Sequence, residues 1–301
     1  MNNDLKTWMQ ASRPFSFPAS IVPVLVGAMF TLAYHEGPVM WWLFPIVLVA
    51  SVLFHAATNL VSEYFDYKKG VDREETFGSS RVLVEKMMKP KSVLYGGIAA
   101  FALGFLLGLV LVYFRGTDML LLGLIGLAGG FFYTGWPIGY KYFALGDLLV
   151  FVLMGPLMVI GSYLALTGTF DMNVFLISLP VGFLVAAILS ANNLRDIIHD
   201  SEAKIKTVAM FLGFKGAKIE YYLLVAGAFI SVLIMVIFGV LAPWALLPFL
   251  SLPVAIRNMK EIARAEENKP GEIAMVDIKT AQHHLMFGVL LSIGLLLTAI
   301  F

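Results

Sequence analysis

The sequence of 301 residues contains no cysteine and little charge. The absence of cysteine excludes a disulfide framework, a zinc–thiolate centre and a thiol nucleophile. Charged residues make up 14% of the chain, whereas an average soluble domain carries roughly 25%. A formal net charge of +1 argues against a nucleic acid or another polyanion as the partner. Because 59% of the residues are apolar, the composition indicates a membrane protein.

Nine apolar stretches approach or exceed the length that a bilayer requires, which is about 20 residues for a helix. We therefore predict an all-α, multi-pass protein with nine transmembrane helices in the lipid bilayer. The expected spans are 15–34, 39–62, 92–113, 118–136, 144–167, 172–194, 217–239, 242–257 and 281–301. The seventh and eighth belong to one uncharged block, and Pro243 predicts the turn that divides them.

The basic residues predict the orientation of these spans. If the N-terminus is cytosolic, every Lys and Arg except Arg115 falls on the cytosolic side. Positive residues accumulate on that side of a cell membrane during insertion. Nine spans then place the C-terminus on the opposite side and leave two long cytosolic loops, 63–91 and 195–218.

A first acidic motif, residues 59–72, lies at the cytosolic end of the second span. Its polar residues are spaced i, i+3, i+4 and i+7, so they share one face of a helix. They are Asn59, Ser62, Glu63 and Asp66. For Asp72, in the loop that follows, metal binding and simple solvation are both open.

A second acidic motif, residues 192–200, ends the sixth span. Asn192, Asp196 and Asp200 are spaced by four, with Asn193 beside them. Both helices run toward the cytosol, so the two motifs emerge at the same level. Carboxylates at membrane depth are costly and usually functional, and facing like charges need a counter-ion. With Lys and Arg residues nearby, Mg²⁺ and a diphosphate fit this arrangement best.

With these motifs, the sequence resembles the UbiA superfamily of intramembrane prenyltransferases over nearly its whole length. The segments that carry the resemblance are Arg-Pro-Phe-Ser-Phe-Pro-Ala-Ser at 13–20, Tyr-Phe-Asp-Tyr-Lys-Lys-Gly-Val-Asp at 64–72, Arg-Val-Leu-Val-Glu at 81–85, Tyr-Thr-Gly at 133–135, Gly-Tyr-Lys-Tyr-Phe-Ala-Leu-Gly-Asp at 139–147 and Asn-Asn-Leu-Arg-Asp-Ile-Ile-His-Asp at 192–200. Within the superfamily it is most similar to the menaquinone-type branch.

The resemblance implies one prenyltransferase domain over residues 1–301, built as a helical bundle around a central cavity. The cytosolic loops would cap an active site that opens toward the cytosol. The implied catalytic residues are Asn59, Asp66, Asn193, Asp196 and Asp200. The implied Mg²⁺ ligands are Glu63, Asp66, Asp72, Asp196 and Asp200. The implied contacts to the diphosphate or the acceptor are Arg13, Arg81, Tyr133, Lys141, Arg195 and Lys206.

One position departs from the family pattern, because Ser62-Glu63 stands where an Asn-Asp pair is usual. The number of metal ions held by the first motif is therefore open. His55, His283 and His284 lie on apolar helices, where histidines are more often satisfied core residues than metal ligands.

The implied function is Mg²⁺-dependent transfer of a polyprenyl group from a polyprenyl diphosphate to a small aromatic acceptor. The branch favours 1,4-dihydroxy-2-naphthoate in menaquinone biosynthesis. Hydroxybenzoate, homogentisate or a glycerol ether are alternative acceptors. A proton- or cation-coupled transporter is an alternative class, but transport sites usually lie near mid-bilayer rather than at one face.

Overall fold

The computed structural model describes residues 5–301, and the named elements in that range are all helices. Seven are long and apolar enough to cross a membrane. They are Pro14–Tyr34, Trp41–Lys69, Pro90–Arg115, Gly146–Thr167, Met172–Arg195, Val208–Ile237 and Pro270–Ile300. The prediction of an all-α, multi-pass membrane protein is confirmed.

Two of the nine predicted spans fall short of this length. Helix α5, Thr117–Phe132, has 16 residues, which cover about 24 Å at 1.5 Å per residue. The stretch predicted at 242–257 is a 3₁₀ helix, η5 (Pro243–Ser251), which continues as the amphipathic helix α11 (Leu252–Arg264). The turn predicted at Pro243 is present, because η5 begins there after α10 has ended.

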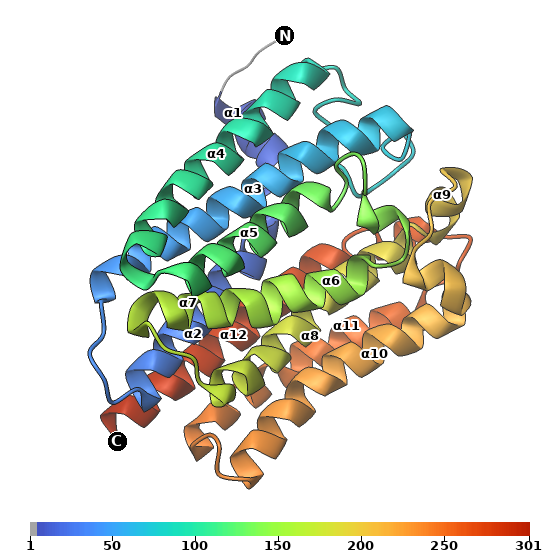
Figure 1. The fold of residues 1–301 in the computed structure, drawn as a ribbon. Coiled ribbons are helices and arrows are strands. Elements are labelled where there is room, and N and C mark those ends of the chain that lie inside the picture. The colour runs from blue at the N-terminus through green and yellow to red at the C-terminus, as the bar shows by residue number, and fades with distance from the viewer. Residues whose placement is uncertain (1–4) are drawn as a thin grey trace.

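Long helices lie side by side and run in alternating directions (Figure 1). The most extensive contacts join α3 (Phe44–Lys69) to α4 (Pro90–Arg115), α8 (Met172–Arg195) to α10 (Val208–Ile237), and α2 (Pro18–Tyr34) to α12 (Val276–Ile300). The shorter elements are α1 (Leu5–Ser12), η1 (Pro14–Ser16), η2 (Trp41–Leu43), η3 (Tyr140–Tyr142), α6 (Gly146–Val152), η4 (Leu153–Leu157), α7 (Met158–Thr167), α9 (Ile197–Glu202) and η6 (Pro270–Ile273). The largest buried cluster of apolar side chains is built around α2, α8, α10 and α12.

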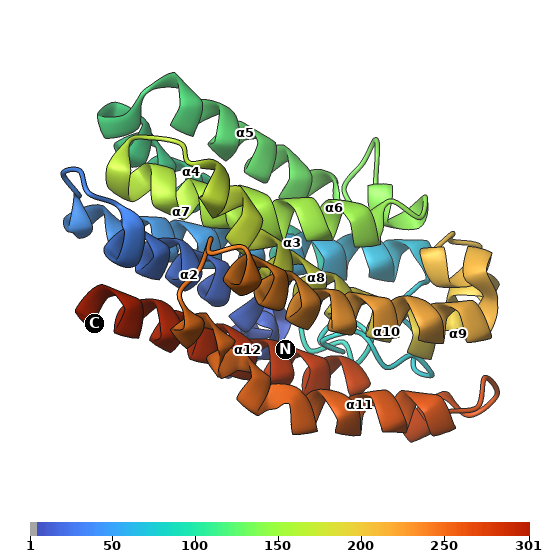
Figure 2. The same ribbon diagram turned by 90° about the horizontal axis from the view of Figure 1, so that it is seen from below.

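The connections that matter for the site gather at one end of the bundle. Figures 1 and 2 both show the α3–α4 loop, the α5–α6 loop and α9 there, with the C-terminus at the opposite end. Both acidic motifs end their helices at this same end. The fold therefore brings 59–72 and 192–200 to one level.

A close contact between two glycines holds α8 against the middle of the α6–α7 span. A Cβ atom added to Gly155 would lie 2.5 Å from the Cα of Gly182. A Cβ added to Gly161, in the same span, would meet nothing within 4 Å. Small residues let membrane helices approach this closely, since packing rather than hydrophobic burial drives their association.

We expect Gly155→Ala to destabilise the protein by about 1–3 kcal/mol, because the backbone of α8 must move away. Gly161→Ala is the matched control and should change stability by less than about 0.5 kcal/mol. Apparent Tm values of the purified variants in detergent provide the measurement. Equal Tm values for the two variants would show that the glycine contact does not hold these helices together.

Candidate active site

The two acidic motifs line one cavity, with a volume of about 350 Å³. Its carboxylates are Asp66, Asp72, Asp196, Asp200 and Asp277. Along α3 the lining continues from Asp66 back to Val47, a length of about 28 Å at 1.5 Å per residue. Most of the remaining wall is apolar, and the charged groups lie at the end near α9. The cavity therefore suits a long apolar molecule with a charged head.

Asp66 is held by two side chains from η3. Lys141 donates to its Oδ2 at 2.8 Å, and the Tyr142 hydroxyl donates to its Oδ1 at 2.8 Å. Asp66 is 1% exposed and the Lys141 side chain is 18% exposed, so the ion pair is mostly removed from water. Burial disfavours the charged form of Lys141, but the Asp66 charge outweighs it and holds the pKa of Lys141 above its ordinary value. Lys141 is therefore a fixed positive charge in the cavity wall.

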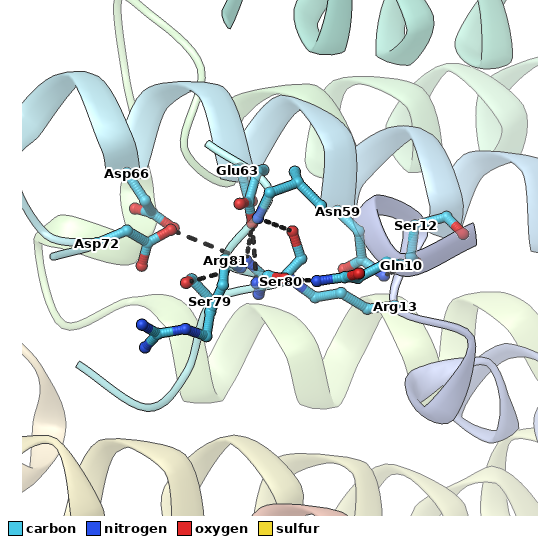
Figure 3. Close-up of polar contacts among 12 residues, drawn as sticks. Gln10, Ser12, Arg13, Asn59, Glu63, Asp66, Asp72, Ser79, Ser80 and Arg81 are labelled. Atoms are coloured by element: carbon cyan, nitrogen blue, oxygen red, sulfur yellow. Dashed lines mark hydrogen bonds and ion pairs between the residues drawn. The ribbon is translucent and has the colours of Figure 1, made fainter. Parts of the chain in front are cut away.

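Glu63 and Asp72 share a second cation, Arg13, which precedes η1. Arg13 Nη2 lies 2.6 Å from Glu63 Oε2 and 4.0 Å from Asp72 Oδ2. The backbone N–H of Ser80 donates to the same Glu63 oxygen at 3.1 Å. Figure 3 shows this group of contacts beside Asp66. Although burial opposes its charge, the two carboxylates hold the pKa of Arg13 above its ordinary value.

Arg195 is a buried residue of the second motif, and it pairs with the aspartate that follows it. Its Nε and Nη2 donate to the two oxygens of Asp196 at 2.9 and 2.7 Å. Its Nη1 lies 2.8 Å from Oδ2 of Asp277, which enters the site from α12. Burial, together with the charges of Asp196 and Asp66, raises the pKa of Asp200 to about 7 against the opposing effect of Lys141. The two motifs are therefore within electrostatic reach of each other.

The carboxylates fit a divalent cation that is shared with a ligand. Two buried oxygens, Asp72 Oδ2 and Glu63 Oε1, have no hydrogen-bond partner. Burial and the neighbouring Asp66 raise the pKa of Asp72 to about 8. Within residues 5–301, no three carboxylate or imidazole groups converge on one point. Mg²⁺ commonly takes one or two carboxylates and completes its shell with water and substrate phosphates, so it does not require such a cluster.

Most of the residues singled out from the sequence line the cavity, and four do not. Arg13, Asn59, Tyr133, Lys141 and Asn193 are in the wall together with the four motif aspartates. Glu63 is fully buried behind the wall. Arg195 is likewise behind it, at Asp196.

The other two, Arg81 and Lys206, lie on the surface. Arg81 pairs with Glu85 at 2.7 Å, and its side chain, 40% exposed, extends away from Glu63 (Figure 3). Lys206 is exposed, and its backbone forms hydrogen bonds with Tyr142 at the end of η3 and with Ala144 in the segment that follows. In this structure neither cation reaches the cavity.

Three residues in or beside the site are not among the predicted site residues, although Tyr142 and Asp147 lie in a segment that carries the family resemblance. Asp277 is an isolated acid at the start of α12, yet it meets Arg195. The position of Tyr142 in the sequence is typical of an interfacial aromatic residue, but its hydroxyl donates a hydrogen bond to Asp66. Asp147 accepts hydrogen bonds from Asn193 at 3.1 and 3.3 Å and so fixes that side chain. Only long-range contacts reveal these roles.

The fold and the cavity together define an integral membrane protein whose cavity is charged at one end and apolar along the rest, a shape that suits an amphiphile. The sequence profile of the UbiA prenyltransferase family matches residues 20–281. The chain is 36% identical to a 1,4-dihydroxy-2-naphthoate octaprenyltransferase of Bacillus subtilis (strain 168), over 96% of this chain and 92% of that protein. It is 33% identical to human UbiA prenyltransferase domain-containing protein 1, over 97% of this chain and 83% of that one.

Solved structures show the same fold. A UbiA homolog from Aeropyrum pernix K1 superposes with a TM-score of 0.67 at 18% identity, covering 99% of both chains. A UbiA homolog from Archaeoglobus fulgidus bound to GPP and Mg²⁺ gives a TM-score of 0.63 at 17% identity, covering 95% of this chain and 99% of that one. The chain belongs to the UbiA prenyltransferase family, and it is a polyprenyl prenyltransferase.

Proposed function

We propose that the protein transfers a polyprenyl group from a polyprenyl diphosphate to 1,4-dihydroxy-2-naphthoate and that the reaction requires Mg²⁺. The observation that carries this proposal is the arrangement of charge in the cavity. Carboxylates from both motifs and the fixed cation Lys141 gather at one end of a long apolar lining. The B. subtilis relative supports the choice of acceptor, and the A. fulgidus structure supports the metal and the diphosphate.

Different residues along the cavity would bind the metal, stabilise the leaving group and enclose the prenyl chain. Asp66 and Asp72 of the first motif and Asp196 and Asp200 of the second would each offer one or two carboxylates to Mg²⁺, which when bound would neutralise charge on the diphosphate and so weaken the allylic C–O bond. Lys141 places a positive charge where the leaving diphosphate gains negative charge, and a charge held in place beforehand is effective in a dry site. The apolar wall holds the prenyl chain and excludes water from the allylic cation.

The arrangement in the membrane is also a proposal. We infer a cytosolic N-terminus, a site that opens to the cytosol and a C-terminus on the far side of the cell membrane, because basic residues gather at the α9 end. We further propose nine crossings within one domain over residues 1–301. A 3₁₀ helix rises about 2.0 Å per residue, so the uncharged stretch 243–256 extends about 26 Å, close to the bilayer core of about 30 Å.

We expect the purified protein to convert radiolabelled geranylgeranyl diphosphate and 1,4-dihydroxy-2-naphthoate into a lipid-soluble labelled product in the presence of Mg²⁺. EDTA should abolish the product, and added Mg²⁺ should restore it, because the diphosphate charge is then neutralised again. Equal turnover with EDTA would contradict the metal requirement. Turnover of hydroxybenzoate but not of the naphthoate would support prenyl transfer but would show that the proposed acceptor is wrong.

A further inference from the structure

A histidine lies in the cavity wall well away from the carboxylates. His55 is on α3, eleven residues before Asp66, and it lines the same cavity. At 1.5 Å per residue the two residues are about 16 Å apart along the helix axis. A diphosphate followed by a bicyclic aromatic ring spans a comparable distance. The imidazole is therefore at the depth where an acceptor ring would lie when the diphosphate is at Asp66.

Two serines hold the imidazole of His55, one at each ring nitrogen. Ser16 Oγ, on η1, lies 3.1 Å from Nε2, and Ser20 Oγ, on α2, lies 2.7 Å from Nδ1. The ring of Phe17 packs edge-on against the imidazole with the centroids 5.6 Å apart. Ser16 and Ser20 also line the cavity, so this polar group faces the space that a ligand would occupy.

The hydrogen bonds of Ser16 determine which nitrogen of His55 carries the proton. The Ser16 hydroxyl donates to the carbonyl oxygen of Arg13 at 2.8 Å, and Asn59 Nδ2 donates to Ser16 Oγ at 3.1 Å. Because a hydroxyl has one hydrogen, Ser16 must accept from His55, so Nε2 is protonated. Nδ1 of the neutral ring is then an acceptor, and the Ser20 hydroxyl donates to it. His55 is a base directed at Ser20.

We propose that His55 takes the hydroxyl proton of the aromatic acceptor through Ser20 during prenyl transfer; this inference rests on the proposed function. The acceptor hydroxyl donates to Ser20 Oγ. As the ring carbon bonds to the prenyl carbon, the diphosphate leaves with the electron pair of the C–O bond. The hydroxyl proton passes to Ser20, the Ser20 proton passes to His55 Nδ1, and the hydroxyl oxygen becomes a ring carbonyl.

The hydrogen bonds of Ser16 and Ser20 can also accommodate the positive charge that this step creates on His55. The imidazolium donates from Nε2 to Ser16 and from Nδ1 to Ser20, so both of its N–H groups keep a partner at the observed distances. Asn59 also donates to the backbone oxygen of Ser12 at 2.9 Å and so keeps Ser16 in place. His55 and Ser20 therefore act on the acceptor, and Ser16 and Asn59 position them.

We expect His55→Gln to lower the single-turnover rate of prenyl transfer by about 100-fold, within the range for general-base catalysis. Ser20→Ala should produce a similar loss, because the relay is broken. His283→Gln is the control: His283 is a fully buried histidine of α12, bonds Ser251 at 3.2 Å and lies outside the cavity wall. Mg²⁺-dependent binding of geranylgeranyl diphosphate should be unchanged in all three variants, which shows that they are folded.

A series of acceptors tests proton transfer itself. Ring-fluorinated 1,4-dihydroxy-2-naphthoates have more acidic hydroxyls, so they need the base less. The ratio of wild-type to His55→Gln rates should fall along this series, and likewise for Ser20→Ala. His283→Gln, which lies outside the relay, should give a ratio that stays close to one for every acceptor.

Two results would overturn the relay. In the first, His55→Gln transfers prenyl groups at the wild-type rate. In the second, its defect is the same for every acceptor, which would make the serine–histidine contacts a structural tie between α2 and α3. The failure of the proposed function is distinct: the wild-type protein and His283→Gln would then also give no product from the naphthoate.

Discussion

Asp66→Asn is expected to reduce prenyl transfer by about 1,000-fold, of the order seen when a preorganised charged or polar group at a reacting centre is removed. Asp66 is buried and pairs with Lys141 at 2.8 Å. The amide keeps the size of the side chain but neither attracts a metal ion nor balances the lysine. The measurement is the initial rate of labelled product formation at saturating Mg²⁺.

Glu220→Gln is the control for this experiment. Glu220 is a partly buried carboxylate on α10, lies 3.4 Å from Ser190 Oγ and does not line the cavity. Its substitution removes one membrane-level charge without touching the site, so transfer should stay within about twofold of the wild type. If Asp66→Asn retained wild-type activity, the first motif would not be the metal site.

Arg13→Gln is expected to destabilise the fold by about 3–5 kcal/mol, because it leaves a buried carboxylate without its cation. Glu63 is 0% exposed, and only the Ser80 N–H would remain on its oxygen. In the double variant Arg13→Gln/Glu63→Gln the fully buried Glu63 charge is removed together with its cation, and the amide oxygen can still accept from Ser80. Asp72, at 4.0 Å the more distant partner of Arg13, loses the cation in both variants. Replacing both members of a buried pair is often close to neutral, so the double variant should recover most of the Tm.

The double variant also separates two roles of Arg13. The cation lines the cavity as well as holding Glu63. If it contacts a ligand, Arg13→Gln/Glu63→Gln will be stable but will bind the diphosphate or the acceptor weakly. Full activity in the double variant would restrict Arg13 to a structural role. Equal Tm values for the single and the double variant would show that the two charges do not stabilise each other.

Much of the site could be predicted because its signals are local. The spacing from Asn59 to Asp66 needs only the helical repeat, and the distribution of Lys and Arg determines which helix ends share a level. The structure accordingly places Asp66, Asp196 and Asp200 on one cavity. The number of helices long enough to span a membrane was less predictable, because hydropathy does not show where the stretch beginning at Pro243 winds as a 3₁₀ helix.

The partners of these carboxylates could not be predicted, because they come from distant parts of the chain. Glu63 meets Arg13 through an approach of η1 to α3, and Asp196 shares Arg195 with Asp277 from α12. A sequence pattern shows that a buried acid needs a counter-charge but not which cation supplies it. For the same reason the proposed role of His55 could not be predicted, because it depends on two serines from neighbouring elements.

The central claim is that both acidic motifs form one metal-dependent diphosphate site. Equilibrium binding of geranylgeranyl S-thiolodiphosphate, an unreactive analogue, tests it directly by calorimetry with Mg²⁺ or with EDTA. The account predicts binding that requires Mg²⁺ and that is lost in both Asp66→Asn and Asp200→Asn, but not in Glu220→Gln. Binding of equal strength with EDTA, or a loss confined to one motif, would contradict it.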